Sequence, residues 1–443
     1  METLRYAAII LIAGTAYAQS DPGPRPGPPG AGRPLPGLTT AEMAFFNEGA
    51  NRFREIDSVS GTEPGATGSG LGPRFNMNTC AGCHAQPAPG GSSPSPSSQQ
   101  NAHVNPQIAV ATEYGAKNTI PSFIQPNGPV RVVRFARNAD GTPDGGVHNL
   151  FVISGRSDAT GCSIVQPDFN SALEQNNAFF RIPTPVYGAG LIESIPDAAI
   201  LANLAANGPL KQQLGILGRV NRSANDGTVT RFGWKAQNKS LLLFGGEAYN
   251  VEQGVTNELF PTERDETPGC ATNPTPEDQT NFTAATPTAS MSDVTGFAQF
   301  MRYLAPPQPA PPGDPSAARG SQVFAQIGCV LCHTPSLQTG NASSAALSRQ
   351  NVPIYSDLAL HNMGQGLADG INQGLAQGGD WRTAPLWGLG QRIFFLHDGR
   401  APDLAAAIEA HASQGSEAAQ VIGGYNALPA QAKQDLIDFL RSL

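Results

Sequence analysis

Two short motifs constrain this chain more than any other feature of its sequence. Residues 80–84 read CAGCH and residues 329–333 read CVLCH, so both follow the pattern Cys-x-x-Cys-His. Two thiols on one helical turn can form thioethers with the two vinyl groups of a porphyrin, and the histidine that follows can bind the iron. The pattern therefore predicts two covalently attached haem c groups. The predicted anchors are Cys80, Cys83, Cys329 and Cys332, and the predicted axial ligands are His84 and His333.

Paired cysteines have two other common uses. Four cysteine thiolates can bind a structural zinc ion, and a Cys-x-x-Cys pair is the active motif of thioredoxin-like proteins. No βαβ pattern surrounds either pair, and neither use explains a histidine directly after both pairs. Haem attachment is therefore the interpretation that we favour.

The composition is that of a globular protein with many turns. The chain has 443 residues, which is enough for two or three domains. The 50 glycines and 39 prolines predict turns and long loops. The formal net charge of −8 offers no basic surface for a nucleic acid, so we expect no nucleic-acid partner.

The first eighteen residues have the features of a secretory signal peptide. Arg5 precedes an apolar run over residues 7–13, and residues 16–18 form a small-x-small cleavage site. The run is shorter than the roughly 20 apolar residues that span a bilayer, and no other stretch is long enough. We expect a periplasmic protein without a membrane span, cleaved near Ala18.

Two cysteines, Cys162 and Cys270, lie outside the haem motifs. In an oxidising compartment such a pair is typically bridged. The bridge would close a loop of about 100 residues, worth up to about 4.7 kcal/mol in the chain-entropy treatment. We predict a structural disulfide, with a redox-active thiol pair or two buried free thiols as the alternatives.

Composition and hydrophobic patterning divide the chain into five segments. The signal peptide, residues 1–18, precedes a Pro/Gly-rich tether at 19–37, which we expect to be extended and poorly ordered. Residues 38–304 are predicted to form the first haem domain, enlarged by loops and a β-strand excursion. A proline-rich linker at 305–315 leads to a C-terminal cytochrome c domain at 316–443. The predicted fold class is mainly α, with two cytochrome c-like haem domains.

Local patterns predict several elements within these domains. Thr39 and Glu42 have the spacing of a capping box. Valine-rich runs at 130–133 and 147–153, next to Asp-Gly turns, predict strands. Further helices are predicted at 196–204, 297–304, 316–324 and 429–443. A helix before the second motif and a closing helix, packed across each other, resemble a small cytochrome c domain.

The two halves of the chain share a second pattern. Residues 185–190 (PVYGAG) resemble residues 385–390 (PLWGLG). Each run follows an arginine and precedes a Pro-Asp pair that opens an alanine-rich helix. We interpret this repeat as evidence for two related domains. An offset of 402 − 196 = 206 residues between the Pro-Asp pairs places His411 opposite Ala205.

The repeat predicts two irons with unequal ligands. We expect His411 to bind the second iron opposite His333, with Met363 as the alternative ligand. The first iron would have an open face, unless His103 on a flexible loop binds it. An open face is what the binding of peroxide or another small-molecule substrate requires.

Residues 382–411 (RTAPLWGLGQRIFFLHDGRAPDLAAAIEAH) resemble the matching segment of the bacterial di-haem cytochrome c peroxidase superfamily, which includes the MauG-type enzymes. The chain is more similar still to exported di-haem oxidoreductases described as thiol oxidoreductases or peroxidases. That resemblance covers nearly all of the chain after the signal peptide. It includes the runs FNMNTCAGCHAQ, GWKAQNKSLLLFGGEAYNVEQGVTNELFP and YSDLALHNMGQGLADG.

The resemblance implies a division of labour between the two haems. In such peroxidases the C-terminal haem takes electrons from a small redox protein, and the N-terminal haem performs the chemistry, with a tryptophan between them. It implies Trp234 as the bridge and a cytochrome or cupredoxin-like protein as the electron partner. His397 matches the His-Asp-Gly run of the family, as a packing residue. Glu193, just after the repeated turn, is our candidate for general acid–base duty.

One departure from the family concerns the substrate. The peroxidases have methionine where this chain has His411, and loss of a thioether ligand lowers the haem potential. The expected function is an exported di-haem c-type oxidoreductase acting on peroxide, or on a thiol or other sulfur compound. The alternative is an electron-transfer cytochrome with two six-coordinate irons. The length of the first domain favours an enzyme.

Overall fold

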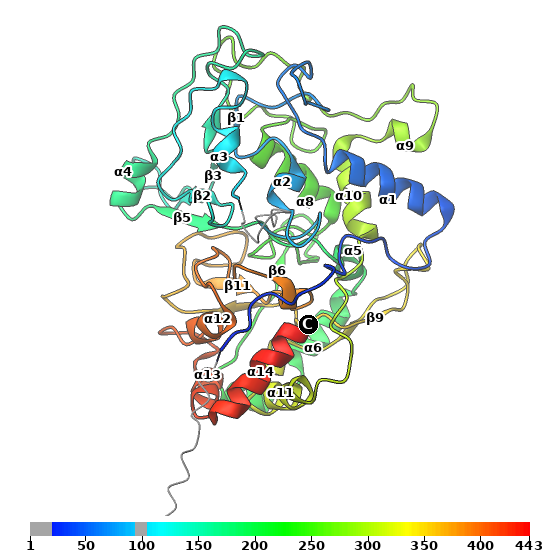
Figure 1. The fold of residues 1–443 in the computed structure, drawn as a ribbon, viewed down its shortest axis with the longest axis vertical. Coiled ribbons are helices and arrows are strands. Elements are labelled where there is room, and N and C mark those ends of the chain that lie inside the picture. The colour runs from blue at the N-terminus through cyan, green and yellow to red at the C-terminus, as the bar shows by residue number, and fades with distance from the viewer. Residues whose placement is uncertain (1–19, 94–103) are drawn as a thin grey trace, which may run out of the picture.

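The computed structural model describes residues 20–93 and 104–443, and most of its regular structure is helical (Figure 1). The strands are short and form sheets of two or three strands. The expected signal peptide and the candidate ligand His103 lie outside the described residues. Within the described ranges, no helix combines the length and the apolar character needed to cross a membrane.

The upper lobe in Figure 1 is built around the crossing of α1 (Thr40–Arg52) and α10 (Asp293–Tyr303). Helix α1 begins at the predicted capping box, with the side chains of Thr39 and Glu42 bonded to each other's backbone N–H groups. The two helices approach closely at Gly49, where a Cβ would overlap the carbonyl oxygen of Gly296. A glycine is therefore required at this crossing.

The lower lobe is built around the crossing of α11 (Pro315–Gln326) and α14 (Ala430–Ser442), the two predicted helices of the C-terminal segment. A Cβ at Gly320 would overlap the carbonyl oxygen of Asp435. The rings of Phe324 and Phe439 pack beside this contact with centroids 5.4 Å apart. The same close crossing thus occurs in both lobes, next to α2 (Cys80–Cys83) in one and η3 (Cys329–Leu331) in the other.

The repeated glycine turns have the same geometry in both lobes. Gly188 and Gly388 have φ values of 63° and 75°, the left-handed region that favours glycine. They precede α5 (Ala189–Glu193) and η4 (Leu389–Gln391), respectively. The second glycine of each turn packs against the last helix of its lobe, at the carbonyl groups of Arg302 and Arg441.

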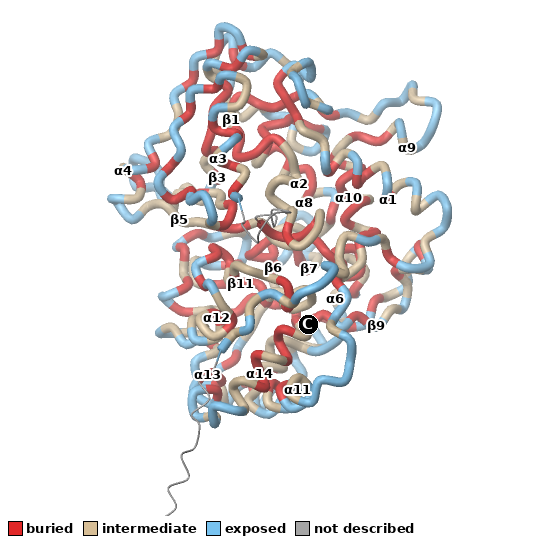
Figure 2. The backbone as a smooth tube through the Cα atoms, in the orientation of Figure 1, coloured by how far each residue is buried: buried red, intermediate tan, exposed pale blue. Residues whose placement is uncertain are grey.

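The predicted β excursion is present in the upper lobe. Strand β2 (Val132–Phe135) pairs antiparallel with β3 (Val147–His148) and β5 (Ala178–Arg181). A second pair joins β1 (Arg74–Phe75) to β4 (Phe151–Val152), with Phe75 and Phe151 fully buried. In Figure 2 the buried stretches, in red, gather in the interior, and the exposed stretches, in pale blue, lie in the outer loops. The predicted disulfide between Cys162 and Cys270 is formed and joins two loops of this lobe.

The remaining elements are short. The helices are α3 (Gln107–Val110), η1 (Glu113–Gly115), α4 (Phe169–Glu174), α6 (Asp197–Ala205), α7 (Gly208–Gln213), α8 (Leu241–Ala248), the π-helix η2 (Tyr249–Gln253), α9 (Pro287–Ser290), α12 (Leu404–Ala410) and α13 (Ala419–Asn426). The strands are β6 (Asn221–Arg222), β7 (Val229–Thr230), β8 (Leu337–Gln338), β9 (Asn351–Val352), β10 (Leu360–Asn362) and β11 (Asp380–Arg382).

Helix α6 does not lie where the repeat places it. It packs against β8 of the lower lobe, where the amide of Asn203 donates to the hydroxyl of Thr334 at 2.9 Å. Further along the chain, Arg219 and Leu360 exchange backbone hydrogen bonds. The Pro-Asp pair sets only where a helix begins, so the alignment of His411 with Ala205 does not make these residues spatial counterparts.

Residues 20–37, the predicted tether, form neither a helix nor a strand, but they are hydrogen-bonded to other parts of the chain. This segment runs beside the proline-rich linker, and backbone hydrogen bonds join Leu35 to Tyr303, Ala305 to Arg33 and Gln308 to Gly30. Proline keeps both segments extended, which leaves their remaining polar groups free to pair with each other. We call residues 20–35 the strap, because they cross from one lobe to the other.

At its N-terminal end the strap forms a buried ion pair with the closing helix, α14. The carboxylate of Asp21 accepts two hydrogen bonds from the guanidinium of Arg441, at 2.7 and 2.8 Å. It also accepts the backbone N–H of Leu404 at the start of α12. Burial works to raise the pKa of Asp21, but these hydrogen bonds and the charge of Arg441 outweigh it and hold the pKa below its ordinary value.

We predict that Asp21→Asn lowers the free energy of unfolding by about 3 kcal/mol at neutral pH, because it leaves a buried guanidinium without its anion. The lowered pKa of Asp21 means that its contribution is present above the ordinary carboxyl pKa and is lost on acidification. Denaturant unfolding at pH 7 and pH 3 measures both effects. Asp140→Asn, in an exposed turn, is the matched control, and equal losses in the two variants at pH 7 would contradict the prediction.

Candidate haem sites

Each lobe encloses a cavity that is lined by one of the two Cys-x-x-Cys-His motifs. The first cavity is lined by Cys80, Cys83 and His84. The second is lined by Cys329, Cys332 and His333. The first is walled by β2, β5, α8 and η2, and the second by α11, α12, α13 and α14.

The separation of the two cysteine pairs excludes a four-cysteine zinc site, because the pairs lie in different cavities. Burial also raises the pKa of the Cys80 and Cys83 thiols, and that of Cys329 to about 12. A buried thiolate is thus disfavoured in both places, whereas a thioether carries no charge.

The motif histidines have the same hydrogen bonds in both cavities. His84 Nδ1 lies 3.0 Å from the carbonyl oxygen of Gly91, and His333 Nδ1 lies 2.9 Å from that of Tyr355. A carbonyl oxygen can only accept, so Nδ1 carries the proton and Nε2 keeps its lone pair. Burial lowers the pKa of both rings to about 4, so both are neutral. This is the state in which histidine binds a metal.

The second cavity holds a third histidine of this kind. His411, directly after α12, donates Nδ1–H to the carbonyl oxygen of Ala407 at 2.7 Å, and burial lowers its pKa. Its charge in turn contributes to lowering the pKa of His333, so the two rings lie within electrostatic range. Met363 lines the same cavity but packs in a cluster with Trp234 and Trp381. Both candidate ligands of the second iron are therefore brought to one cavity.

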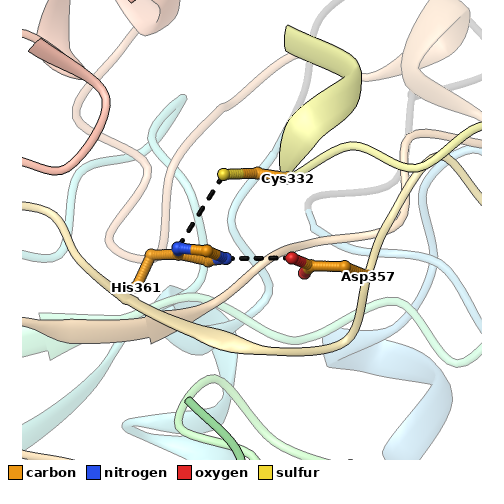
Figure 3. Close-up of side chains that lie close together, drawn as sticks. All are labelled: Cys332, Asp357 and His361. Atoms are coloured by element: carbon orange, nitrogen blue, oxygen red, sulfur yellow. Dashed lines mark hydrogen bonds and ion pairs between the residues drawn. The ribbon is translucent and has the colours of Figure 1, made fainter. Parts of the chain in front are cut away.

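A fourth histidine, His361, also reaches this cavity but has no free lone pair. Figure 3 shows it between Cys332 and Asp357, with Nε2 3.0 Å from the Asp357 carboxylate. Its Nδ1 lies 2.8 Å from Glu417. Burial lowers the pKa of His361, but Asp357 and Cys332 raise it well above its ordinary value. Cys332, Asp357 and His361 bring potential metal-ligand atoms close together in space. Cys332 is an anchor of the haem motif, so we do not interpret the three residues as a metal site.

Polar side chains that sequence reasoning missed line the first cavity. They are Arg134, Arg181, Gln237, Glu247 and Glu252. Burial raises the pKa of Glu252 to about 7, although Arg134 and a hydrogen bond from Asn76 at 2.9 Å oppose the rise. Glu252 lies in a π-helical turn, a local distortion that is frequent at functional sites. No spacing in the sequence marks these residues, because they come from β2, β5, the loop before α8, α8 itself and η2.

Glu193, the residue predicted for general acid–base duty, has its carboxylate in contacts between helices. One carboxylate oxygen accepts the N–H of Leu241 at 2.8 Å, and the other pairs with Arg302 at 2.9 Å. Glu193 therefore ties α5 to α8 and α10, and it does not line the first cavity.

Trp234 lines both cavities and the small cavity between them. Its indole N–H donates to the carbonyl oxygen of Ile182 at 2.8 Å, which fixes the ring in place. His397, also on the second cavity, stacks on Trp381 with centroids 3.6 Å apart. Burial lowers the pKa of His397 well below its usual range, consistent with the packing role expected for it.

Two crossed-helix lobes, each with a cavity for one c-type haem, define a class of di-haem proteins. A family model described as "Di-haem oxidoreductase, putative peroxidase" matches residues 132–443. The chain belongs to this family. Membership implies two haems, and the Cys-x-x-Cys pairs at 80–83 and 329–332 are consistent with covalent attachment.

Two solved structures show distant similarity. Hydrazine synthase of Kuenenia stuttgartiensis is 12% identical, with a TM-score of 0.35 and 100% of both chains covered. A MauG-like protein associated with microbial copper homeostasis is 19% identical, with a TM-score of 0.24 over 34% of this chain and 52% of that one. Both TM-scores are too low to support a conclusion. No curated protein matches the chain with significance.

The residues that line the two cavities fit a haem. Besides the thiols and the imidazoles, each cavity contains buried polar atoms that have no hydrogen-bond partner among the described residues. In the first cavity they are Thr79 Oγ1, Arg134 Nε, Arg181 Nε and Gln237 Oε1, and in the second Arg392 Nη2. Buried polar atoms are normally paired, so these require further polar groups, such as the two carboxylates of a haem.

We predict that His411→Ala converts the second haem from low-spin to high-spin, because the iron then loses the imidazole that His411 would supply. Visible absorption and EPR spectra of the purified protein measure this as the loss of one low-spin signal. Met363→Leu is the matched variant and should leave both spectra unchanged. The opposite pattern would make Met363 the ligand.

Proposed function

We propose that this protein is a periplasmic di-haem oxidoreductase that reduces peroxide in the first cavity with electrons received through the second. The observation that carries the proposal is the inequality of the two cavities. The second contains His333 and His411, both with a free Nε2, whereas His84 is the one histidine of the first cavity among the described residues. An iron held by His84 would therefore be able to bind a substrate.

The proposal assigns iron ligands and domains. His84 would bind the first iron, and His333 and His411 would bind the second. The first haem domain would span residues 38–304 and the C-terminal domain 316–443. The disulfide between Cys162 and Cys270 supports a location in an oxidising compartment.

The first cavity has side chains suited to peroxide. Reduction of one peroxide to two waters consumes two electrons and two protons. A haem held by Cys80, Cys83 and His84 would supply the redox chemistry for this reaction. Glu252 can take the proton from one peroxide oxygen and return it to the other, because its pKa of about 7 permits both directions. Arg134 lines the same cavity and can donate to an oxygen that gains negative charge.

The electrons would come from a small cytochrome or cupredoxin-like protein and pass between the cavities beside Trp234. Trp234 is suited to this because its ring forms part of the wall of both cavities. A thiol or other sulfur compound is the second class of substrate, since a second iron with two imidazoles has a lower potential than one with a thioether. Steady-state assays with peroxide and with thiosulfate separate the two classes.

We predict that fully reduced protein, mixed with hydrogen peroxide, loses electrons from both haems, and that Trp234→Phe slows oxidation of the second haem by about tenfold or more. The aromatic wall between the cavities is smaller in this variant, whereas the first cavity keeps His84 and Glu252. Stopped-flow absorbance resolves the two phases. Trp387→Phe, which alters only the small cavity, is the matched control.

Carbon monoxide distinguishes this enzyme from an electron carrier. The proposal requires that one reduced haem binds carbon monoxide and that peroxide oxidises the protein. Two low-spin haems that bind no carbon monoxide and do not react with peroxide would identify an electron-transfer cytochrome instead.

We predict that the rate of reaction with peroxide rises with pH through about 7, because ionised Glu252 accepts the first proton. Glu252→Gln should lower this rate by roughly 10²–10⁴-fold and remove its pH dependence near neutrality. Glu247→Gln is the comparison, since Glu247 lines the same cavity and is held by Asn238. A larger effect of Glu247→Gln would move the proton-transfer role to that residue.

A further inference from the structure

A small cavity lies between the two haem cavities, and two arginines on its wall are unusual. Arg382 and Arg392 line both the small cavity and the second haem cavity, next to Trp234. The cysteine anchors of the second motif do not line the small cavity. The two guanidinium groups therefore lie on the side of the second cavity that faces the upper lobe.

Neither guanidinium has a carboxylate partner among the described residues. Arg382 donates to the carbonyl oxygens of Gly233 and Thr383. Arg392 donates Nε–H to the carbonyl oxygen of Phe394 at 2.8 Å, and its Nη2 has no partner. Burial alone lowers the pKa of both to about 10, with no contribution from an acidic side chain.

This situation differs from that of the other buried arginines. Of the five arginines that are buried in the described ranges, four have an acidic partner, and Arg382 is the exception. The four pairs are Arg156–Asp158, Arg181–Asp369, Arg231–Asp197 and Arg441–Asp21. A buried cation without an anion is strongly unfavourable, so Arg382 and Arg392 indicate an anion that the chain itself does not supply.

The chemistry of a haem c supplies such an anion in the right place. A haem c has two carboxylates on the edge away from its two thioether bonds. With the thioethers at Cys329 and Cys332, that edge would lie away from these cysteines, and Arg382 and Arg392 are the two arginines on the wall of the second cavity. A planar guanidinium binds a carboxylate through two parallel hydrogen bonds, which would use the free Nη2 of Arg392.

We propose that Arg382 and Arg392 bind the two carboxylates of the second haem, and that these two cations raise its reduction potential. This inference rests on the proposed function, which places a haem in the second cavity. A reduced haem has one more negative charge than an oxidised haem, so nearby buried cations favour reduction. The two arginines would thereby offset part of the decrease in reduction potential that a second imidazole ligand causes.

The test is a potentiometric titration of the haem-loaded protein, followed by visible absorbance. In Arg392→Gln we expect the midpoint reduction potential of the low-spin haem to fall by about 59 mV. This shift is a tenfold change in the one-electron equilibrium constant. Arg392→Lys keeps the positive charge, so its midpoint potential should lie close to that of the wild type. Arg349→Gln removes the same charge from an exposed loop of the lower lobe and should leave the midpoint unchanged.

Two results would overturn the inference. One is an unchanged midpoint in Arg392→Gln and Arg382→Gln variants whose thermal unfolding matches the wild type. The other is a midpoint in the wild type that shifts with added small anions, which would make the small cavity an anion site instead. Arg382→Lys and Arg392→Lys provide the comparison if the glutamine variants do not fold. Mass spectrometry separates failure of this inference from failure of the proposed function. A protein without two covalent haem adducts would contradict the proposed function itself, because no second haem would be present.

Discussion

The close crossing of two helix pairs determines the rest of this structure. In each lobe a glycine lets two backbones approach where a side chain would overlap a carbonyl group, at Gly49 in one and Gly320 in the other. Aromatic rings pack beside both contacts. In the lower lobe the haem motif begins shortly after α11, and in the upper lobe the backbone N–H of Ala81 donates to the carbonyl oxygen of Phe53, directly after α1. The crossing therefore helps to position each Cys-x-x-Cys-His motif against its cavity.

The two cavities differ because different segments complete them. In the lower lobe, α12 brings His411 into a largely apolar cavity, where burial keeps the imidazole neutral. In the upper lobe the remaining wall comes from the inserted sheet and the π-helical turn, which contribute Arg134 and Glu252. The insertions thus replace a second imidazole with charged groups. This difference in chemistry is the basis for assigning substrate reduction to the first cavity and electron relay to the second.

The boundary between the lobes also contributes to the site. Trp234 belongs to the wall of both cavities, and Arg382 and Arg392 lie beside it without acidic partners. The strap and the linker run along this boundary and hydrogen-bond to each other, so the lobes are joined by more than one chain segment. The proposed electron transfer requires that the distance between the two cavities stays constant. The hydrogen bonds between the strap and the linker help to keep it so.

The sequence by itself determined the features that depend on residues close in the chain or on covalent chemistry. These include the two haem motifs, the capping box at Thr39, the closing helix α14 and the pairing of Cys162 with Cys270. Only the tertiary structure decided the pairing of the strap with the linker, the position of α6, and the contacts and environment of Glu193 and Glu252. Capping and motif spacing act over a few residues, whereas the environment of a carboxylate or a proline-rich segment is set by whichever distant segments pack against it.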